Sequence, residues 1–287
     1  MSKKSSTFAC QFDEHMKIAI IGAGSVGTNL HHAFELKGIK TELVHARPLT
    51  ANDPSPMTND QSPITNDQSL TVHLPQADIY IYTVADCALE EVVSKVNAPK
   101  ALHLHTSGTM PLETFGADKP HAGVLYFFQS FSRTMLIDDW SNIPCFIEGR
   151  NIDDVAAIYS LAQTLTSHIY ECSQSDRERL HIAGVFANNY SNLMYRIAAE
   201  VLRSTSIPFE ALLPLIDQTA AKVHGMAPKD AQTGPAQRGD AAVMEHHVKV
   251  LETMPDGLFN AAEVREVYQA LAALIGKAHN HQALPNG

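Results

Sequence analysis

The chain has 287 residues and a formal net charge of −10 at pH 7, with 45% hydrophobic and 18% charged residues. This length allows one large or two medium domains, and the composition is that of an ordinary globular enzyme. The acidic balance argues against a nucleic-acid partner and favours a small molecule. No apolar run is long enough to span a membrane, and the four cysteines lack metal-binding or redox spacing, so we expect a cytoplasmic protein.

The start of the chain is polar and carries no apolar segment of the kind found in a secretion signal. We therefore expect residues 1–15 to form a disordered N-terminal extension. Residues 17–21 are an apolar run that predicts a short strand, and Leu30, Ala33 and Phe34 follow at helical spacing.

Between this strand and this helix, the glycines are spaced as G-x-G-x-x-G. Gly22 permits a tight turn, Gly24 lets the backbone approach a pyrophosphate, and Gly27 lets the helix pack against the strand. Ser25 and Val26 open the helix, whose free N–H groups and positive dipole end attract phosphates. The sequence therefore predicts that these five residues bind a dinucleotide.

The end of the second predicted strand, residues 41–45, indicates which dinucleotide binds. NAD-binding proteins place an acid about 20 residues beyond the glycine motif, where it binds the ribose hydroxyls. Here the strand ends in His45-Ala46-Arg47, without Asp or Glu. An Arg at this position can pair with a 2′-phosphate, which favours NADP over NAD. The alternative is that Arg47 is a solvated loop charge.

Residues 49–69 contain a near repeat, in which Ser-Pro-Met-Thr-Asn-Asp-Gln is followed by Ser-Pro-Ile-Thr-Asn-Asp-Gln. Such a polar segment cannot bury a core, so we expect a flexible insertion in the nucleotide-binding domain. A lid over the cofactor and a neutral insertion both remain open.

Strand and helix patterns then alternate before strand signals stop near residue 175. We predict strands at residues 78–84, 101–105, 123–127, 145–148 and 169–172, and helices at 88–96 and 153–165. We predict further helices at residues 176–203, 209–224, 236–254 and 261–278. The alternation indicates a parallel sheet covered on both faces.

The predicted fold class is therefore α/β, with a doubly wound, mostly parallel Rossmann sheet followed by an all-helical C-terminal domain. We place the dinucleotide-binding domain at residues 16–172 and the helical substrate and dimerisation domain at residues 173–287. The helical domain is rich in Ala, Leu, Val and Ile. Because this apolar surface exceeds what the nucleotide domain can cover, we expect a twofold homodimer through the helices.

Ligands of open α/β sheets bind outside the carboxyl ends of the strands. Two predicted strands end there in Val84-Ala85 and in Thr106-Ser107-Gly108. Val84 and Ala85 are candidates for contact with the cofactor. Ser107 offers a hydroxyl for catalysis or substrate binding, and Gly108 bares neighbouring N–H groups to an anion. An ordinary tight turn is the alternative.

Three histidines raise the question of a metal site. His103 and His105 lie on one strand face by the two-residue period, and His121 follows after the next loop. No further ligand has suitable spacing, and buried hydrogen-bonded histidines are common. We predict no metal.

Several phrases of the sequence resemble one protein family. They are Val84-Ala85-Asp86, His105-Thr106-Ser107-Gly108, Phe128-Gln129-Ser130-Phe131, Phe146-Ile147-Glu148-Gly149, Val185-Phe186-Ala187-Asn188-Asn189 and Thr233-Gly234-Pro235-Ala236-Gln237-Arg238-Gly239-Asp240. From Met16 onward the chain resembles the Rossmann-like NADP oxidoreductases whose C-terminal half is a domain of unknown function, number 2520. This family is part of the superfamily of 6-phosphogluconate, 3-hydroxyisobutyrate, ketopantoate and pyrroline-carboxylate reductases.

The resemblance implies a helical domain similar to that of 6-phosphogluconate dehydrogenase, and it also suggests a homodimer. It makes Gln129 a candidate for substrate binding. The Ser107 loop is similar to the serine-containing loop with which hydroxyisobutyrate-type enzymes hold a substrate carboxylate near the nicotinamide. The family supplies no settled substrate.

One position departs from the related hydroxyacid dehydrogenases, in which a Lys that exchanges the hydroxyl proton lies four residues before an Asn. Asn189 matches that Asn, but Val185 stands in place of the Lys and cannot transfer a proton. His181 lies one helical turn earlier, and at 100° per residue Asn188 and Asn192 share its face to within about 40°. A His in a cleft is a competent acid or base near neutral pH.

We therefore interpret His181, Asn188 and Asn189 as catalytic candidates and Asn192 as a substrate contact. The alternative is that His181 packs structurally against the sheet. Farther along, residues 233–240 predict a loop that enters a helix at Pro235 or Ala236. There, exposed N–H groups and Arg238 would bind an anionic substrate group or a cofactor phosphate.

Together these patterns predict an NADP(H)-dependent oxidoreductase that acts on a small anionic carbonyl, hydroxy or imine compound. The alternative is a non-catalytic NADP-binding sensor or regulator that lacks the proton-transfer lysine. Val185 favours the alternative, whereas His181, Ser107, Asn188 and Arg238 favour the enzyme.

Overall fold

The computed structural model describes residues 16–45, 74–255 and 257–282. Contacts divide the chain into Met1–Val185, here called the sheet unit, and Phe186–Gly287, here called the helical unit. The sheet unit includes helix α4 (Gln174–Gly184), which the sequence analysis groups with the helical part. The predicted extension at residues 1–15, the insertion at residues 49–69 and Arg47 lie outside the described residues.

The sheet unit is built on seven strands in the order β2-β1-β3-β4-β5-β6-β7. The strands are β1 (Ile18–Ile21), β2 (Thr41–Val44), β3 (Ile79–Tyr82), β4 (Leu102–His105), β5 (Ala122–Phe127), β6 (Cys145–Gly149) and β7 (Ile169–Glu171). The remaining elements are α1 (Ser25–Leu36), α2 (Asp86–Ser94), the 3₁₀ helix η1 (Leu112–Phe115), α3 (Ile152–Gln163) and α4. The predicted strands and helices of this part are therefore confirmed, with ends shifted by a few residues.

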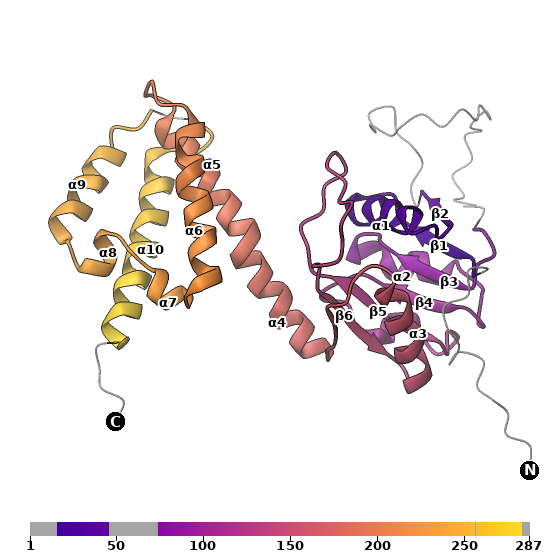
Figure 1. The fold of residues 1–287 in the computed structure, drawn as a ribbon. Coiled ribbons are helices and arrows are strands. Elements are labelled where there is room, and N and C mark those ends of the chain that lie inside the picture. The colour runs from indigo at the N-terminus through magenta and orange to yellow at the C-terminus, as the bar shows by residue number, and fades with distance from the viewer. Residues whose placement is uncertain (1–15, 46–73, 256, 283–287) are drawn as a thin grey trace, which may run out of the picture. The chain divides into compact units, whose positions relative to one another are not determined.

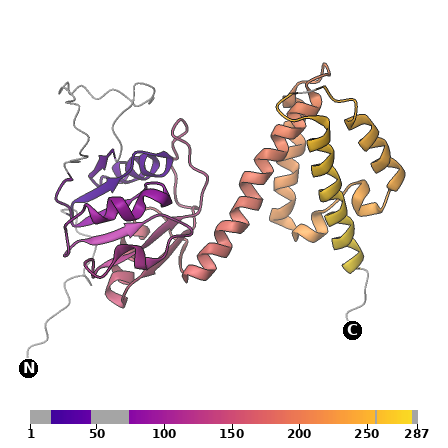
Figure 2. The same ribbon diagram turned by 180° about the vertical axis from the view of Figure 1, so that it is seen from behind.

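Helices cover both faces of the sheet, as Figures 1 and 2 show from opposite sides. Alternate residues of the central strands enter two separate cores. One core contains Ile20, Ile81 and Leu104 together with apolar residues of α1 and α3. The other contains Tyr80 and Tyr82 with residues of α2 and η1. Burial on both faces explains why these strands read as nearly continuous apolar runs.

The pairing of β5 with β6 is the antiparallel pairing in this mostly parallel sheet. Strands β1 to β5 pair in parallel, but β5 and β6 pair antiparallel, with Leu125 opposite Ile147. A parallel neighbour requires a crossover connection, usually a helix. Residues 128–144 form no helix between these strands, so the chain returns in the opposite direction. The sheet is mostly parallel, as the fold class predicts.

The helical unit consists of helices throughout its described residues. They are the π-helix η2 (Val185–Tyr190, whose first residue belongs to the sheet unit), α5 (Ser191–Leu202), the 3₁₀ helix η3 (Phe209–Leu212), α6 (Leu213–Gly225), α7 (Pro228–Ala231), α8 (Pro235–Arg238), α9 (Ala241–Leu251) and α10 (Ala261–Gln282). Helix α10 contacts α8 and α9. His247 of α9 and Tyr268 of α10 form a hydrogen bond of 2.9 Å.

Two predicted continuous helices are interrupted. The helix at residues 176–203 contains the π-helical turn η2, so regular α-helical spacing does not hold along its length. The helix at residues 236–254 breaks at Gly239, whose φ of 67° is left-handed and ends α8. Asp240 then starts α9, because its side chain accepts a hydrogen bond from the Val243 backbone N–H.

Two glycines of the G-x-G-x-x-G motif provide a matched stability test. A Cβ on Gly27 would lie 1.8 Å from the Gly22 carbonyl oxygen, whereas a Cβ on Gly24 would meet nothing within 4 Å. Gly27→Ala should therefore lower the free energy of unfolding by about 2 kcal/mol or more, because backbone must shift. Gly24→Ala should change it by no more than about 0.5 kcal/mol. Urea denaturation of both variants measures this difference, and equal stabilities would contradict the assigned packing.

Candidate functional site

The glycine motif forms a turn between β1 and α1 that leaves backbone open at one end of the sheet. Gly22 has a φ of 120°, and a Cβ there would lie 2.8 Å from the Thr83 hydroxyl oxygen. That hydroxyl donates a hydrogen bond of 2.6 Å to the Gly22 carbonyl. Gly24 begins α1 without a side-chain cap. The first N–H groups of the helix therefore remain suited to an anion.

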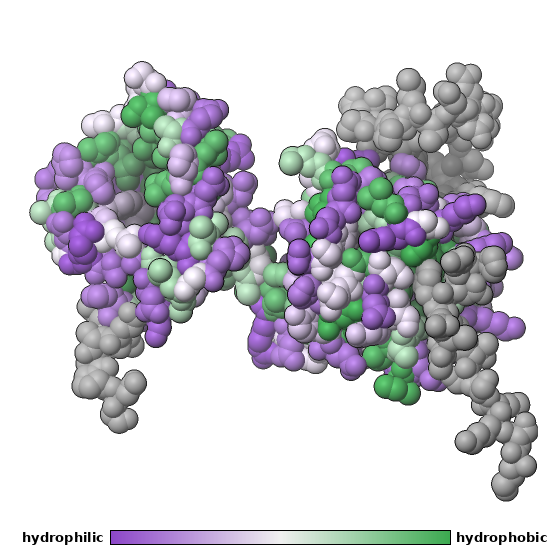
Figure 3. All heavy atoms as spheres, in the orientation of Figure 1, coloured by the Kyte–Doolittle hydropathy of each residue, from purple (hydrophilic) through white to green (hydrophobic). Residues whose placement is uncertain are grey.

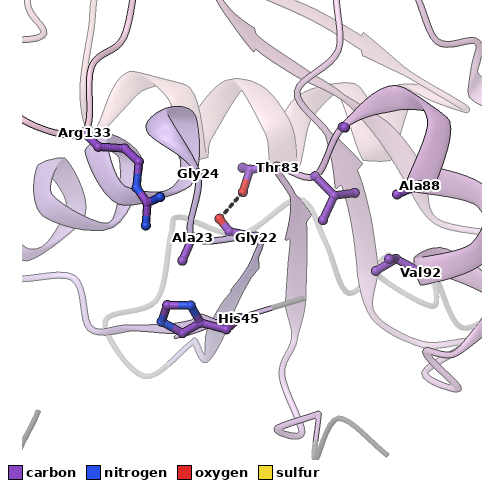
Figure 4. A pocket seen from close by; sticks show the side chains of 10 residues that line it. Gly22, Ala23, Gly24, His45, Thr83, Ala88, Val92 and Arg133 are labelled. Atoms are coloured by element: carbon purple, nitrogen blue, oxygen red, sulfur yellow. Dashed lines mark hydrogen bonds between the residues drawn. The ribbon is translucent and has the colours of Figure 1, made fainter. Parts of the chain in front are cut away.

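A pocket of about 260 Å³ lies over this turn. Figure 4 shows its walls. They are formed by Gly22, Ala23, Gly24, His45, Thr83, Val84, Ala85, Ala88, Val92 and Arg133. Four predicted cofactor residues are among them: Gly22, Gly24, Val84 and Ala85. Ser25, Val26 and Gly27 are the first residues of α1, which starts at this turn.

The pocket has an apolar side and a basic side. Val84 follows β3, and Ala88 and Val92 belong to α2. His45 and Arg133 lie across the glycine turn from Ala88 and Val92 (Figure 4). Sequence reasoning missed His45 as a lining residue, although it directly follows β2. It also missed Arg133, which lies more than 100 positions beyond the motif and carries no local signal.

A second cluster lies at the carboxyl ends of β3 and β4. Asp86 directly follows Ala85 of the pocket wall, and its Oδ2 accepts hydrogen bonds from the hydroxyls of Ser107 (3.0 Å) and Thr109 (2.7 Å). The Ser107 oxygen also accepts from the backbone N–H groups of Thr109 and Met110, each at 3.0 Å. One donor and two acceptor positions are all that a hydroxyl has. In this arrangement Ser107 closes the turn after β4.

Helix α4 brings His181 against this turn. A Cβ on Gly108 would lie 2.7 Å from His181 Nδ1, so glycine is required for the imidazole to pack here. His181 Nδ1 is also within 3.1 Å of the Tyr126 hydroxyl on β5. Burial raises the pKa of Tyr126 to about 12, which keeps the hydroxyl protonated. The structure thus brings together Gly108, Ser107 and His181, three of the predicted site residues.

Gly184 and Arg177 also hold α4 in place within the sheet unit. A Cβ on Gly184 would lie 2.7 Å from the Phe128 ring, so the helix packs closely on that side chain. The guanidinium of Arg177 is buried; it pairs with Glu148 of β6 and donates to the Met110 carbonyl at 2.7 Å. The ion pair attaches α4 to β6, and the hydrogen bond attaches it to the loop after Ser107.

The histidines that suggested a metal serve other purposes. His103 bonds the Tyr82 hydroxyl and the Ala98 carbonyl, each at 2.9 Å. His121 pairs with Asp154 at 2.9 Å. Among the residues that the structure describes, no group of three His, Cys, Asp or Glu side chains is arranged to hold a metal ion.

Of the other predicted site residues that the structure describes, Gln129 belongs to the sheet unit and the rest belong to the helical unit. Gln129 is exposed, and its side chain accepts from the backbone N–H of Ser130. Asn188 and Asn189 are exposed on the π-helical turn, and Asn192 is exposed on α5. The exposed Arg238 ends α8, which begins at Pro235 as predicted. Their roles stay predictions.

Comparison with known proteins identifies the family. Residues 143–275 match the domain of unknown function DUF2520. The candidate NADP oxidoreductase BF3122 from Bacteroides fragilis is 32% identical, with a TM-score of 0.75 over 92% of this chain and 99% of that one. The chain therefore belongs to the family of Rossmann-like NADP oxidoreductases with a C-terminal DUF2520 domain. No curated protein matches the chain.

More distant structures share the fold. Protein TM1727 from Thermotoga maritima is 15% identical, with a TM-score of 0.62 over 93% of this chain and all (100%) of that one. The reductive aminase from Aspergillus terreus, in complex with NADPH and ethyl levulinate, is 16% identical, with a TM-score of 0.59 over 93% and 94% of the two chains. Within the described residues, no helix is both long and apolar enough to cross a membrane.

The buried His105 leads to a pH prediction. Burial, followed by the nearby Arg177, lowers its pKa from 6.5 to about 3. At a pH between 3 and 6.5, His105 binds a proton in the unfolded chain but not in the folded chain. The free energy of unfolding therefore falls as the pH drops below about 6.5. His105→Gln should reduce the loss of stability between pH 7 and pH 5 by about 1 to 2 kcal/mol.

Urea denaturation at the two pH values measures this effect. His45→Gln, at an exposed position, serves as the control and should leave the difference unchanged. A wild-type pH dependence in His105→Gln would show that the imidazole is accessible to protons in the folded state.

Proposed function

We propose that this protein is an NADP(H)-dependent oxidoreductase that acts on a small anionic carbonyl, hydroxy or imine compound. The observation that carries the proposal is His181, whose imidazole packs on Gly108 after β4 and contacts Tyr126 of β5, while the glycine-turn pocket lies at the ends of β1 to β3 in the same sheet. Family membership supports the oxidoreductase class. The nature of the substrate rests on the sequence.

The lining of the pocket has the chemistry that a dinucleotide requires. Space is open above Gly24, and no side-chain cap occupies the start of α1, so phosphate oxygens could approach these N–H groups. Val84, Ala88 and Val92 offer an apolar surface to an adenine ring. His45 lies at the end of β2, where a ribose 2′-phosphate is expected. These residues would hold NADP(H), which when bound supplies or accepts a hydride.

His181 is the proposed acid or base. When the imidazole is protonated, its Nδ1–H can donate to the Tyr126 hydroxyl oxygen, and its Nε2–H is the proton that passes to a substrate oxygen or nitrogen in general acid catalysis. The neutral imidazole that results keeps its proton on Nδ1, and its Nε2 takes a proton back as general base in the reverse direction. Ser107 acts as a positioning residue, because its hydroxyl proton is directed to Asp86.

A non-catalytic NADP-binding sensor or regulator is the second candidate function. Val185 favours it, because valine replaces the proton-transfer lysine of the related hydroxyacid dehydrogenases. Stopped-flow mixing of the protein with NADPH and a panel of keto acids and cyclic imines separates the two candidates. Oxidation of NADPH with any member supports the enzyme, and binding of NADPH without turnover across the panel supports the sensor.

For the enzyme, His181→Ala should lower turnover on the order of 10²-fold while NADPH affinity stays unchanged. The reason is that the imidazole contacts Gly108 and Tyr126 and does not line the cofactor pocket. Tyr126→Phe, which removes only the hydroxyl, should change turnover less and shift its pH profile. Full turnover in His181→Ala would make His181 structural. Hydroxyacid dehydrogenase activity gained by Val185→Lys would favour the sensor.

We also propose that the helical unit forms a twofold homodimer. Among its described residues only Leu251 and Val264 are buried, while apolar side chains such as Phe186, Leu215 and Leu274 are more than half exposed. Figure 3 shows apolar residues gathered around a hollow of this unit. Such an exposed apolar surface is typical of a subunit interface.

Light scattering at micromolar concentration should therefore give about twice the mass of the 31.3 kDa chain. Leu215→Glu, at a 65% exposed position, should shift the protein toward the monomer, because a charge in an apolar interface is costly. Glu245→Lys, on an exposed polar position of α9, is the matched control. A wild-type monomer at this concentration contradicts the proposal.

A further inference from the structure

Residues 128–144, which follow β5 and which we call the strap, form hydrogen bonds and an ion pair with helix α1. The buried Asn29 of α1 donates to the Ser132 carbonyl at 2.7 Å and accepts from the Ile137 N–H at 3.0 Å. His32, one turn farther along α1, pairs with Asp138 at 2.7 Å. Strands β3 and β4 lie between β1 and β5 in the sheet, so the strap spans the core instead of following neighbouring strands.

An aromatic anchor holds the far part of the strap. Trp140 is 2% exposed, and its ring lies edge-on to Phe127 with centroids 4.8 Å apart. It also stacks with Phe131 at 5.2 Å, and its indole N–H donates to the Ile137 carbonyl at 2.9 Å. The strap is therefore held before Arg133 by the contacts of Phe131 and Ser132 and after Arg133 by those of Ile137 and Trp140.

The attached strap places Arg133 in the wall of the cofactor pocket. In Figure 4 its guanidinium lies beside Ala23 and Gly24, on the side opposite the apolar surface of α2. A guanidinium placed next to the start of α1 adds a full positive charge to the partial positive charge of the helix end.

We propose that Arg133 binds the pyrophosphate of the dinucleotide and that the strap is the device that positions it there. The inference rests on the proposed dinucleotide binding and adds a residue that lies outside the glycine motif. Arginine suits this task because its N–H groups bind phosphate oxygens in pairs. The pyrophosphate is favoured over the 2′-phosphate because Arg133 lies at Ala23 and Gly24, where the turn and the helix start bring N–H groups to the same place.

The test is the affinity of the full-length protein for NADPH and for NADH, measured by calorimetry in wild type and in Arg133→Ala. Arg133→Ala should weaken both dinucleotides by a similar factor of about tenfold or more, because both carry the pyrophosphate. Arg179→Ala removes an arginine that is 74% exposed on α4 and should change neither affinity. Unfolding curves of the two variants should show that both are folded at the temperature of the binding measurement.

Each outcome bears on a different claim. A loss confined to NADPH assigns Arg133 to the 2′-phosphate and overturns the pyrophosphate assignment. Unchanged affinities in Arg133→Ala overturn the inference while leaving the proposed function intact. A wild-type protein that binds neither dinucleotide overturns the proposed function and the inference together.

A second variant tests the strap itself. Asn29→Ala removes the two hydrogen bonds that hold Ser132 and Ile137, so it should weaken dinucleotide binding through Arg133. The double variant Asn29→Ala/Arg133→Ala should then lose no more dinucleotide affinity than Arg133→Ala alone, because both substitutions remove the same contact with the dinucleotide. Additive losses would show that Asn29 does not act through Arg133.

Discussion

The close approach of Gly27 to the Gly22 carbonyl is the contact on which the rest of the sheet unit depends. It sets the angle between β1 and α1, and the Thr83 hydroxyl locks the same carbonyl to the end of β3. With the turn held from both sides, the backbone at Gly24 faces open space and the start of α1 is exposed. The dinucleotide pocket is therefore a consequence of close packing between backbone segments, which the Thr83 hydroxyl reinforces.

A second dependence runs through α4. Its position on the sheet is determined by two glycines that accept bulky rings, Gly108 under His181 and Gly184 under Phe128, and by the buried guanidinium of Arg177. The buried charge is tolerated because Glu148 pairs with Nη1 and the Met110 carbonyl accepts from Nη2. Since Arg177 and His181 are one turn apart on the helix, the ion pair also holds the imidazole at the turn after β4.

Local patterns were sufficient to predict the strands, the glycine turn and the helical second half, because periodicity and glycine spacing are properties of neighbouring residues. The placement of Val84, Ala85 and Ser107 at one edge of the sheet was also predictable, since the carboxyl ends of parallel strands meet there. Local patterns did not predict the direction of β6 or the π-helical turn. They also did not predict the positions of Tyr126 and Arg133. Each is decided by contacts between residues far apart in the sequence, such as Asn29 with Ser132.

The π-helical turn has a consequence for how the missing lysine is interpreted. It begins at Val185, one residue after Gly184 packs on Phe128, and covers the segment that carries Asn188 and Asn189. An i→i+5 turn changes the angular spacing of side chains, so counting four residues back from an Asn does not identify the residue that would take the place of the lysine. His181 is instead supported by its own contacts, Gly108 and Tyr126, both of which belong to the sheet unit that also contains the pocket. Packing around the imidazole therefore supports His181 as the proton-transfer residue, whichever residue aligns with the lysine.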